Sequence, residues 1–171
     1  MADYYTSWSF ALEVSQEELE WVKKVFEQLE KMTDTADDGA RDVLRDEIET
    51  KFGVIVGDVF EDDGHDFIPF DYSWNDTDER SIWFHGDCGG QAGAAEIVRA
   101  FLQQWRPTAS TDITWAETCS KPRPGDFAGG AIFITATSKT FFHTADWLKQ
   151  MHEEFERSKN KKRGRKRNEE G

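Results

Sequence analysis

The alternation of residues from Tyr4 to Val14 constrains the fold of this chain more than any other feature of its sequence. Every second residue is large or β-branched, and the residues between are mostly small or polar. A period of two is the pattern of a strand with one buried face. Ser15 follows at once, with Glu18 three residues later, so the strand should lead into a helix that begins with a capping box. The large or β-branched residues of this alternation are Tyr4, Thr6, Trp8, Phe10, Leu12 and Val14.

Four further segments repeat apolar residues at the helical spacing of three or four. These repeats predict helices over about 16–32, around 43–48, over about 91–105 and over about 144–157. The second of them should end before Gly53, which suits a helix C-terminus.

Runs of β-branched and aromatic residues predict strands over 67–74, 81–87, 112–119 and 127–137, and a short strand within 53–60. Pro69 makes the first of these an edge strand or places a bulge in it. The order of elements predicts an α+β fold. We expect a single antiparallel or mixed sheet with helices packed on one face, as a ferredoxin-like or split βαβ variant.

The charge of the chain is unevenly distributed. Residues 158–171 hold seven Lys/Arg and two Glu, a net charge of +5, whereas 1–157 hold 14 basic and 32 acidic residues, a net charge of −18. Sixteen of the acidic residues and only three basic ones lie between Asp34 and Glu79. We therefore expect one domain over 1–157, followed by a basic tail over 158–171 that has no fixed conformation.

The two cysteines and the apolar content indicate the compartment. Two cysteines in 171 residues are no disulfide framework. No apolar run approaches the roughly 20 residues that cross a bilayer, and Met1 to Tyr5 has no signal-peptide pattern. The sequence predicts a cytoplasmic protein without membrane contact.

The glycine-rich segment Gly86–Gly93 joins a strand to a helix, where exposed amides can hold phosphate. Neither GxGxxG nor GxxxxGK[ST] is present, and Asp87 would repel an anion. We interpret this segment as a tight turn with close helix packing, and we predict no cofactor.

Cysteine and histidine residues raise the question of a metal or a nucleophile. His85 and Cys88 lie close in sequence, and Cys119 and His143 follow later, but no CxxC or HxxxH spacing is present. We predict structural cysteines, no metal site and no catalytic residue.

Glu117 shares a strand face with Ile113 and Trp115, and a carboxylate on an apolar face needs a partner. Lys121, Arg123 or a neighbouring strand would supply it. Glu117 is then either an acid/base or binding carboxylate in a pocket, or an anchor for the following proline turn.

Two acidic stretches, Asp34–Asp42 and Glu61–Asp66, do not match the calcium-loop pattern. They are either solvated loops or part of an acidic face for a basic partner. The candidate binding residues there are Asp37, Asp38, Asp62, Asp63 and Asp66.

The basic tail offers a second binding surface. Lys162, Arg163 and Arg165 would contact nucleic-acid phosphates weakly and without sequence preference, or fold back onto the acidic body. No RNA-binding aromatic motif is interleaved with them.

Three parts of the C-terminal half carry a family resemblance: Trp115-Ala116-x-Thr118-Cys119-Ser120-Lys121-Pro122-Arg123, Phe127-Ala128-Gly129-Gly130-Ala131, and Trp147. With these the chain resembles small uncharacterised proteins of bacterial phages, plasmids and other mobile elements. That family has no assigned activity, so the resemblance implies only an accessory role in a bacterial cytosol. Some small acidic proteins of such elements inhibit host restriction or CRISPR systems, a few as DNA mimics.

Three functions remain open, and the sequence leaves the oligomeric state undetermined. The first is a non-enzymatic acidic domain that binds a protein with a basic surface, such as a host nucleic-acid-binding system that it inhibits. The second is nucleic-acid binding through the basic tail. The third is a small enzyme with a pocket around Glu117, supported by His85 or Cys88.

Overall fold

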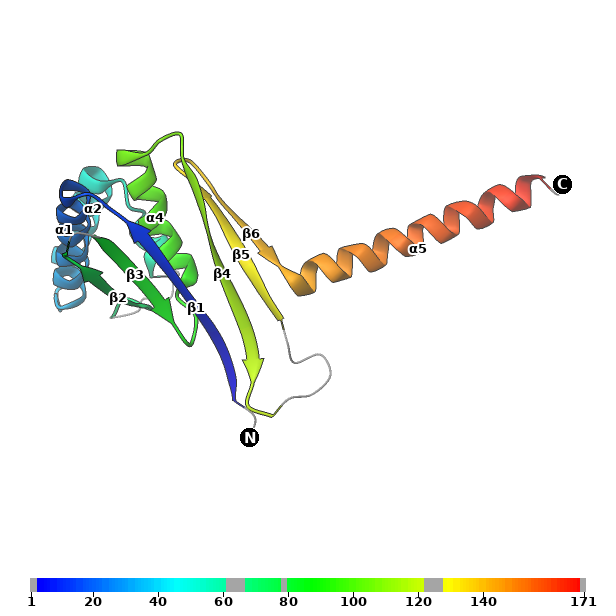
Figure 1. The fold of residues 1–171 in the computed structure, drawn as a ribbon, viewed down its shortest axis with the longest axis horizontal. Helices are drawn as coiled ribbons and strands as arrows, with labels where there is room; N and C mark the ends of the chain where they lie inside the picture. The colour runs from blue at the N-terminus through cyan, green and yellow to red at the C-terminus, as the bar shows by residue number, and fades with distance from the viewer. Residues whose placement is uncertain (1–2, 61–66, 78–79, 122–127, 170–171) are drawn as a thin grey trace.

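The computed structural model describes residues 3–60, 67–77, 80–121 and 128–169. Six strands form one antiparallel sheet in the order β2-β3-β1-β4-β5-β6 (Figure 1). The fold is α+β, as predicted, and the sheet is antiparallel rather than mixed. The strands are β1 (Tyr4–Glu13), β2 (Asp71–Asn75), β3 (Ser81–Gly86), β4 (Ser110–Cys119), β5 (Ala128–Thr135) and β6 (Lys139–His143).

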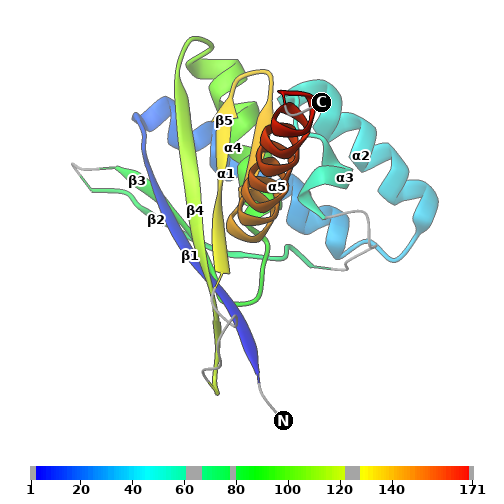
Figure 2. The same ribbon diagram turned by 90° about the vertical axis from the view of Figure 1, so that its right-hand side faces the viewer.

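Five helices pack against this sheet in two different ways. Four of them cover one face, and the fifth begins at the end of β6, where the Thr144 hydroxyl bonds the backbone of Gly129. From there it extends away on the other side of the sheet (Figures 1 and 2). The helices are α1 (Gln16–Thr33), α2 (Asp38–Phe52), α3 (Val56–Val59), α4 (Gln91–Trp105) and α5 (Thr144–Glu169).

The alternation of the first strand sets the two faces of the sheet. Trp8 and Leu12 are buried toward the helices, whereas Ser7, Ser9 and Glu13 are exposed on the opposite face. The strand pairs with β4 through Tyr4–Trp8 and with β3 through Trp8–Glu13, so the two halves of the sheet meet at Trp8. Its indole N–H donates to the carbonyl of Gly89 at 2.7 Å, which satisfies the polar atom of this buried ring.

One hydrophobic core lies between the sheet and α1–α4. It is rich in aromatic contacts, among them the stacked rings of Phe26 and Tyr72 at 3.8 Å between centroids and the edge contacts of Phe70. Such large side chains bury much apolar area per residue, which explains how a chain with 37% hydrophobic residues fills a core. The largest fully buried side chains include Phe26, Phe84, Phe101, Ile97 and Ile132.

The predicted capping box is present at the start of α1. Ser15 accepts from the Glu18 backbone N–H, and a Glu18 carboxylate oxygen accepts from the Ser15 N–H at 2.7 Å. The same carboxylate accepts two bonds from Arg106, at 3.0 and 2.8 Å, at the end of α4. Burial favours the neutral form, but the bonds from Arg106 and Ser15 outweigh it and hold the pKa of Glu18 below its ordinary value.

Replacing Glu18 by Gln should therefore lower the free energy of unfolding by about 1–2 kcal/mol at pH 7, the size of a lost cap and charged bond. Because the folded pKa is depressed, the stabilisation is present above the unfolded value near 4.5 and is lost as pH falls through the folded pKa. Urea unfolding at pH 7 and pH 3 should show that the difference in unfolding free energy between Glu18→Gln and the unmodified chain is smaller at pH 3. Glu17→Gln, in the same first turn, is the control, and an equal effect of both would contradict the assignment.

Four elements differ from the predictions. The segment 53–60 contains α3 rather than a strand, because the carboxylates of Glu96 and Glu49 accept the backbone N–H groups of Ile55 and Val56. β2 begins only at Asp71, beyond Pro69, although it is an edge strand as expected. β6 was not predicted, because it is short and exposes both of its phenylalanines.

The fourth difference is the end of the chain. α5 continues to Glu169, through the segment for which the sequence predicts no fixed conformation. The domain boundary at residue 157 stays a prediction. Within the described ranges, the helices are too short or too polar to span a bilayer.

Candidate functional site

The outer side of α2 carries a row of carboxylates. Asp38, Asp42 and Asp46 follow each other at intervals of four residues, so they lie on one line of the helix, and Glu47 lies beside them. We call these four residues the acidic α2 face; all four are exposed. Asp37 caps the helix, because its carboxylate accepts from the Ala40 N–H at 2.8 Å. An aspartate at the cap and another in the first turn also suit the positive end of the helix dipole.

An exposed apolar side chain lies within the acidic α2 face. Val43 is 58% exposed and lines a shallow hollow of about 520 Å³ together with Asp46, Glu47, Thr50 and Lys51. Apolar contact at the centre and charge at the rim are the usual arrangement of a protein interface. This surface therefore has the shape and charge to receive a basic segment with an apolar residue.

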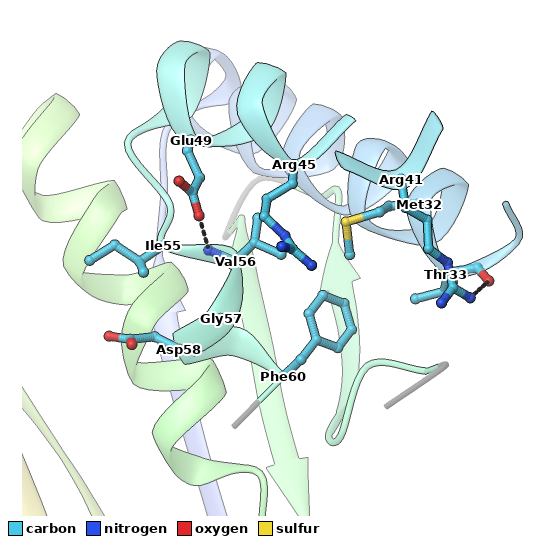
Figure 3. Close-up of a pocket in the computed structure, with 10 residues that line it drawn as sticks. All are labelled: Met32, Thr33, Arg41, Arg45, Glu49, Ile55, Val56, Gly57, Asp58 and Phe60. Atoms are coloured by element: carbon cyan, nitrogen blue, oxygen red, sulfur yellow. Dashed lines mark hydrogen bonds between the residues drawn. The ribbon is translucent and has the colours of Figure 1, made fainter. Parts of the chain in front are cut away.

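The other side of α2 borders a pocket of about 460 Å³. Figure 3 shows Arg45 and Glu49 of α2 above it and Phe60 below it. Its volume falls in the range of small-molecule sites. The lining residues are Met32, Thr33, Arg41, Arg45, Glu49, Ile55, Val56, Gly57, Asp58 and Phe60.

The polar groups of this pocket hold the helices together. The Arg41 guanidinium donates to the carbonyl of Thr35 at 2.7 Å, which fixes the α1–α2 turn. The Glu49 carboxylate accepts from the Val56 N–H at 3.1 Å, which fixes α3 (Figure 3). Arg45 lies 3.5 Å from Asp42 and is half exposed. Among the described residues, the lining holds the carboxylates of Glu49 and Asp58 and no cysteine or histidine.

Glu117 lies on the helix-covered face of β4, and its partners are not the expected ones. Its carboxylate bonds His143 Nε2 at 2.8 Å and accepts from the Trp115 indole N–H at 3.1 Å. Lys121 is exposed beyond the end of the strand, and Arg123 lies outside the described residues. His143 reaches Glu117 from β6, two strands away, because Gly130 pairs with both Trp115 and His143 and has no side chain to separate them. Sequence reasoning missed this contact because it did not predict β6.

The proposed enzymatic groups do not share one site. His85 points to the exposed face of β3, 3.8 Å from Asp71, whereas Glu117 lies on the opposite face of the sheet. Cys88 follows β3 and is exposed, and Cys119 is buried. Over the ranges that the structure covers, no three His, Cys, Asp or Glu side chains are grouped to hold a metal ion. Glu117 and His85 therefore do not line one pocket.

The remaining candidates are the three aspartates that follow Phe60 and the basic residues near the end of the chain. Asp62, Asp63 and Asp66 are outside the described residues. Lys162, Arg163 and Arg165 lie on α5, which leads away from the sheet on the side opposite to α1 and α2 (Figure 1). The structure thus separates the acidic and the basic surfaces of one chain.

The comparisons with other proteins add no family to this geometry. A scan of family models, a search of curated proteins and a search of solved structures each find no match to this chain.

Proposed function

We propose that this chain is a non-enzymatic binding domain whose acidic α2 face engages the basic surface of a protein partner. One observation carries the proposal: Val43 is exposed and lines a shallow hollow together with the carboxylates of Asp46 and Glu47. An isolated apolar residue on a surface needs no explanation. The combination with a line of carboxylates is what favours an interface.

The electrostatics of the body support a basic partner. Residues 1–157 carry a net charge of −18, which steers basic surfaces toward the domain and repels phosphates. Complementary charge mainly increases the rate of association and the selectivity, while the apolar centre slows dissociation. In its finer form, the proposal names the partner as a nucleic-acid-binding protein of a bacterial host that the domain inhibits, in line with the resemblance to proteins of mobile elements.

The fold is compatible with a finer description as well. We infer that β2-β3-β1-β4 is a split βαβ unit of the ferredoxin-like kind, extended by β5 and β6. The support is the connection of β1 to β2 through α1–α3 and of β3 to β4 through α4, each across an intervening strand.

Reversing two charges of the acidic α2 face should abolish capture of the partner. In pull-downs from bacterial lysate at low salt, the chain with Asp42→Lys and Asp46→Lys should retain at most about a tenth of the salt-labile protein that the unmodified chain retains, since each 1.4 kcal/mol is a tenfold change in affinity. High salt should release the partner from the unmodified chain, because the charges are exposed and screened.

The matched control changes the net charge by the same amount elsewhere. Glu17 and Glu27 are exposed on α1 and do not line the hollow beside Val43, so their double replacement by Lys should leave capture intact. Equal loss in both variants would show that only the total charge matters. Absence of any salt-labile partner would reject the proposed function.

A further inference from the structure

The face of the sheet opposite α1–α4 has no helix lying over it (Figure 2). Four large rings are exposed there, on four different strands: Tyr5 by 42%, Trp83 by 48%, Phe133 by 51% and Phe142 by 45%. We call this surface the open sheet face. Phe133 and Phe142 lie on neighbouring strands, two residues apart in register, and exposed rings gathered on an uncovered sheet face indicate an interaction site.

The middle of the open sheet face is hollowed. β1 and β4 diverge beyond their pairing at Trp8, and small side chains line a depression of about 520 Å³ there, among them Ser7, Ser9, Thr114 and Ala116. The strands of this face carry three acidic residues, Glu13, Asp71 and Asp112, within the ranges that the structure covers. These three carboxylates are spread over three strands, whereas the four of the acidic α2 face lie within residues 38–47 of one helix, so a second copy would meet a lower density of negative charge on the open sheet face.

A second uncovered surface belongs to α5. Between Ala145 and Arg157, the side chains that the structure describes are exposed except for the half-buried Met151. Trp147 is 47% and Leu148 51% exposed, and together with Met151 they form one apolar stripe at helical spacing. A helix in water owes most of its stability to the packing of such a stripe. At 1.5 Å per residue its 26 residues extend about 39 Å, far beyond the first turn that contacts β5.

We propose that two copies of this chain associate through these two surfaces, the open sheet face and the apolar stripe of α5. The helix rises from the β6 edge on the same side as the open sheet face, toward the viewer in Figure 2. It stands beside that face and does not lie over it. A second copy enters the angle between them, and two-fold symmetry lets each copy offer the same pair of surfaces to the other.

The charges of the chain favour a second copy over another protein at this place. Residues 159–167 at the far end of α5 include seven Lys/Arg, and residues 1–157 carry −18. Within one chain, α5 leads the basic end away from the acidic helices (Figure 1). In a pair, the basic end of each α5 lies along the acidic body of the other copy, which offsets the repulsion between two bodies of the same sign.

The area is sufficient for a stable pair. Five interstrand spacings and about seven residues per strand give a face of about 24 by 23 Å, so two such faces bury about 1,100 Å². Stable interfaces bury about 1,200–2,000 Å² in total. The stripes of the two α5 helices supply the remainder.

The molar mass of the full chain in solution tests this proposal. Sedimentation or light scattering at about 1–100 µM should give twice the single-chain mass of 19.7 kDa at the upper concentrations. Phe133→Ser and Leu148→Ser, each at an exposed position on one of the two surfaces, should each raise the dissociation constant of the pair at least about tenfold, as central apolar contacts do. Circular dichroism should show both variants folded, because neither side chain belongs to the core of the single chain.

Val43→Ser is the matched control, since Val43 is equally exposed but lies on the acidic α2 face; it should leave the pair unchanged. Joint replacement of Lys162, Arg163 and Arg165 by Gln should weaken the pair several-fold at low salt and have no effect at high salt. A single-chain mass at every concentration overturns the proposal and leaves a different protein as the occupant. A pair that survives both Phe133→Ser and Leu148→Ser overturns it as well, because its interface must then lie elsewhere.

Discussion

Replacing Glu96 by Gln should lower the free energy of unfolding by about 3–5 kcal/mol, the usual cost of removing one partner from a buried ion pair. The Glu96 side chain is fully buried on α4, and among the described residues it is the only carboxylate that forms an ion pair with Arg99. Its oxygens lie 2.6 Å from Arg99 and 2.7 Å from Lys139, both of which are nearly buried. Gln has nearly the same volume as Glu and can still accept a hydrogen bond, so the expected loss of stability measures the contribution of the negative charge.

The size of this effect follows from what the network connects. Arg99 also donates to the carbonyl of Gly53 at the end of α2, and Glu96 accepts the Ile55 N–H before α3. The ion pair with Lys139 connects the start of β6 to Glu96. The bond to Glu96 raises the pKa of Arg99, against the opposing effect of burial, so this guanidinium keeps its charge and cannot become neutral when its partner is lost.

Chemical denaturation at neutral pH measures the loss. Glu153→Gln is the control, because Glu153 forms the same kind of helical ion pair, with Arg157 at 3.1 Å, on the exposed surface of α5. Such a pair contributes only about 0.3–0.5 kcal/mol. Similar losses of unfolding free energy in the two variants would mean that burial does not increase the contribution of the Glu96 ion pair to stability.

Replacing Gly90 by Ala should lower the free energy of unfolding by about 3 kcal/mol or more. Gly90 caps α4 with φ of 79°, in the left-handed region that costs a residue with a side chain about 1–2 kcal/mol. An added Cβ would also lie 2.1 Å from the carbonyl oxygen of Pro69, a backbone atom that cannot rotate away. The helix would have to move off the segment before β2.

Gly89→Ala separates these two causes. Gly89 has φ of 115°, but an added Cβ would meet nothing closer than 4.0 Å, so only the backbone strain of about 1–2 kcal/mol applies. In thermal unfolding, the midpoint temperature of Gly90→Ala should be well below that of Gly89→Ala. Equal midpoints would show that the contact with Pro69 relaxes freely. The close approach agrees with the interpretation of this segment as a turn with close helix packing.

Local sequence patterns predicted the elements that have their own period and their own end signals. The alternation of β1, the capping box of Ser15 and Glu18, and the stripe of α4 each specify type and boundaries within one segment. The patterns failed where contacts from distant parts of the chain decide the conformation. The apolar segment 53–60 reads as a strand, yet carboxylates on α4 and α2 bind its backbone and hold α3.

The candidate site shows the same division. The sequence located an acidic region between Asp34 and Glu79, since charge is a matter of composition, and it included Asp37 and Asp38. It did not reveal that Asp42, Asp46 and Val43 share one exposed surface, because that depends on which side of α2 packs on the core. The pairing of Glu117 with His143 likewise required the register of three strands.

By itself, the sequence determined the α+β class, the first strand and most helices, and the separation of an acidic body from a basic tail, because periodicity and charge are local properties of the chain. Only the tertiary structure decided which face of the sheet stays open and that α5 leaves the body on that side (Figure 2). Those choices depend on how distant segments share one core, and a strand that alternates has no means of specifying what covers its second face.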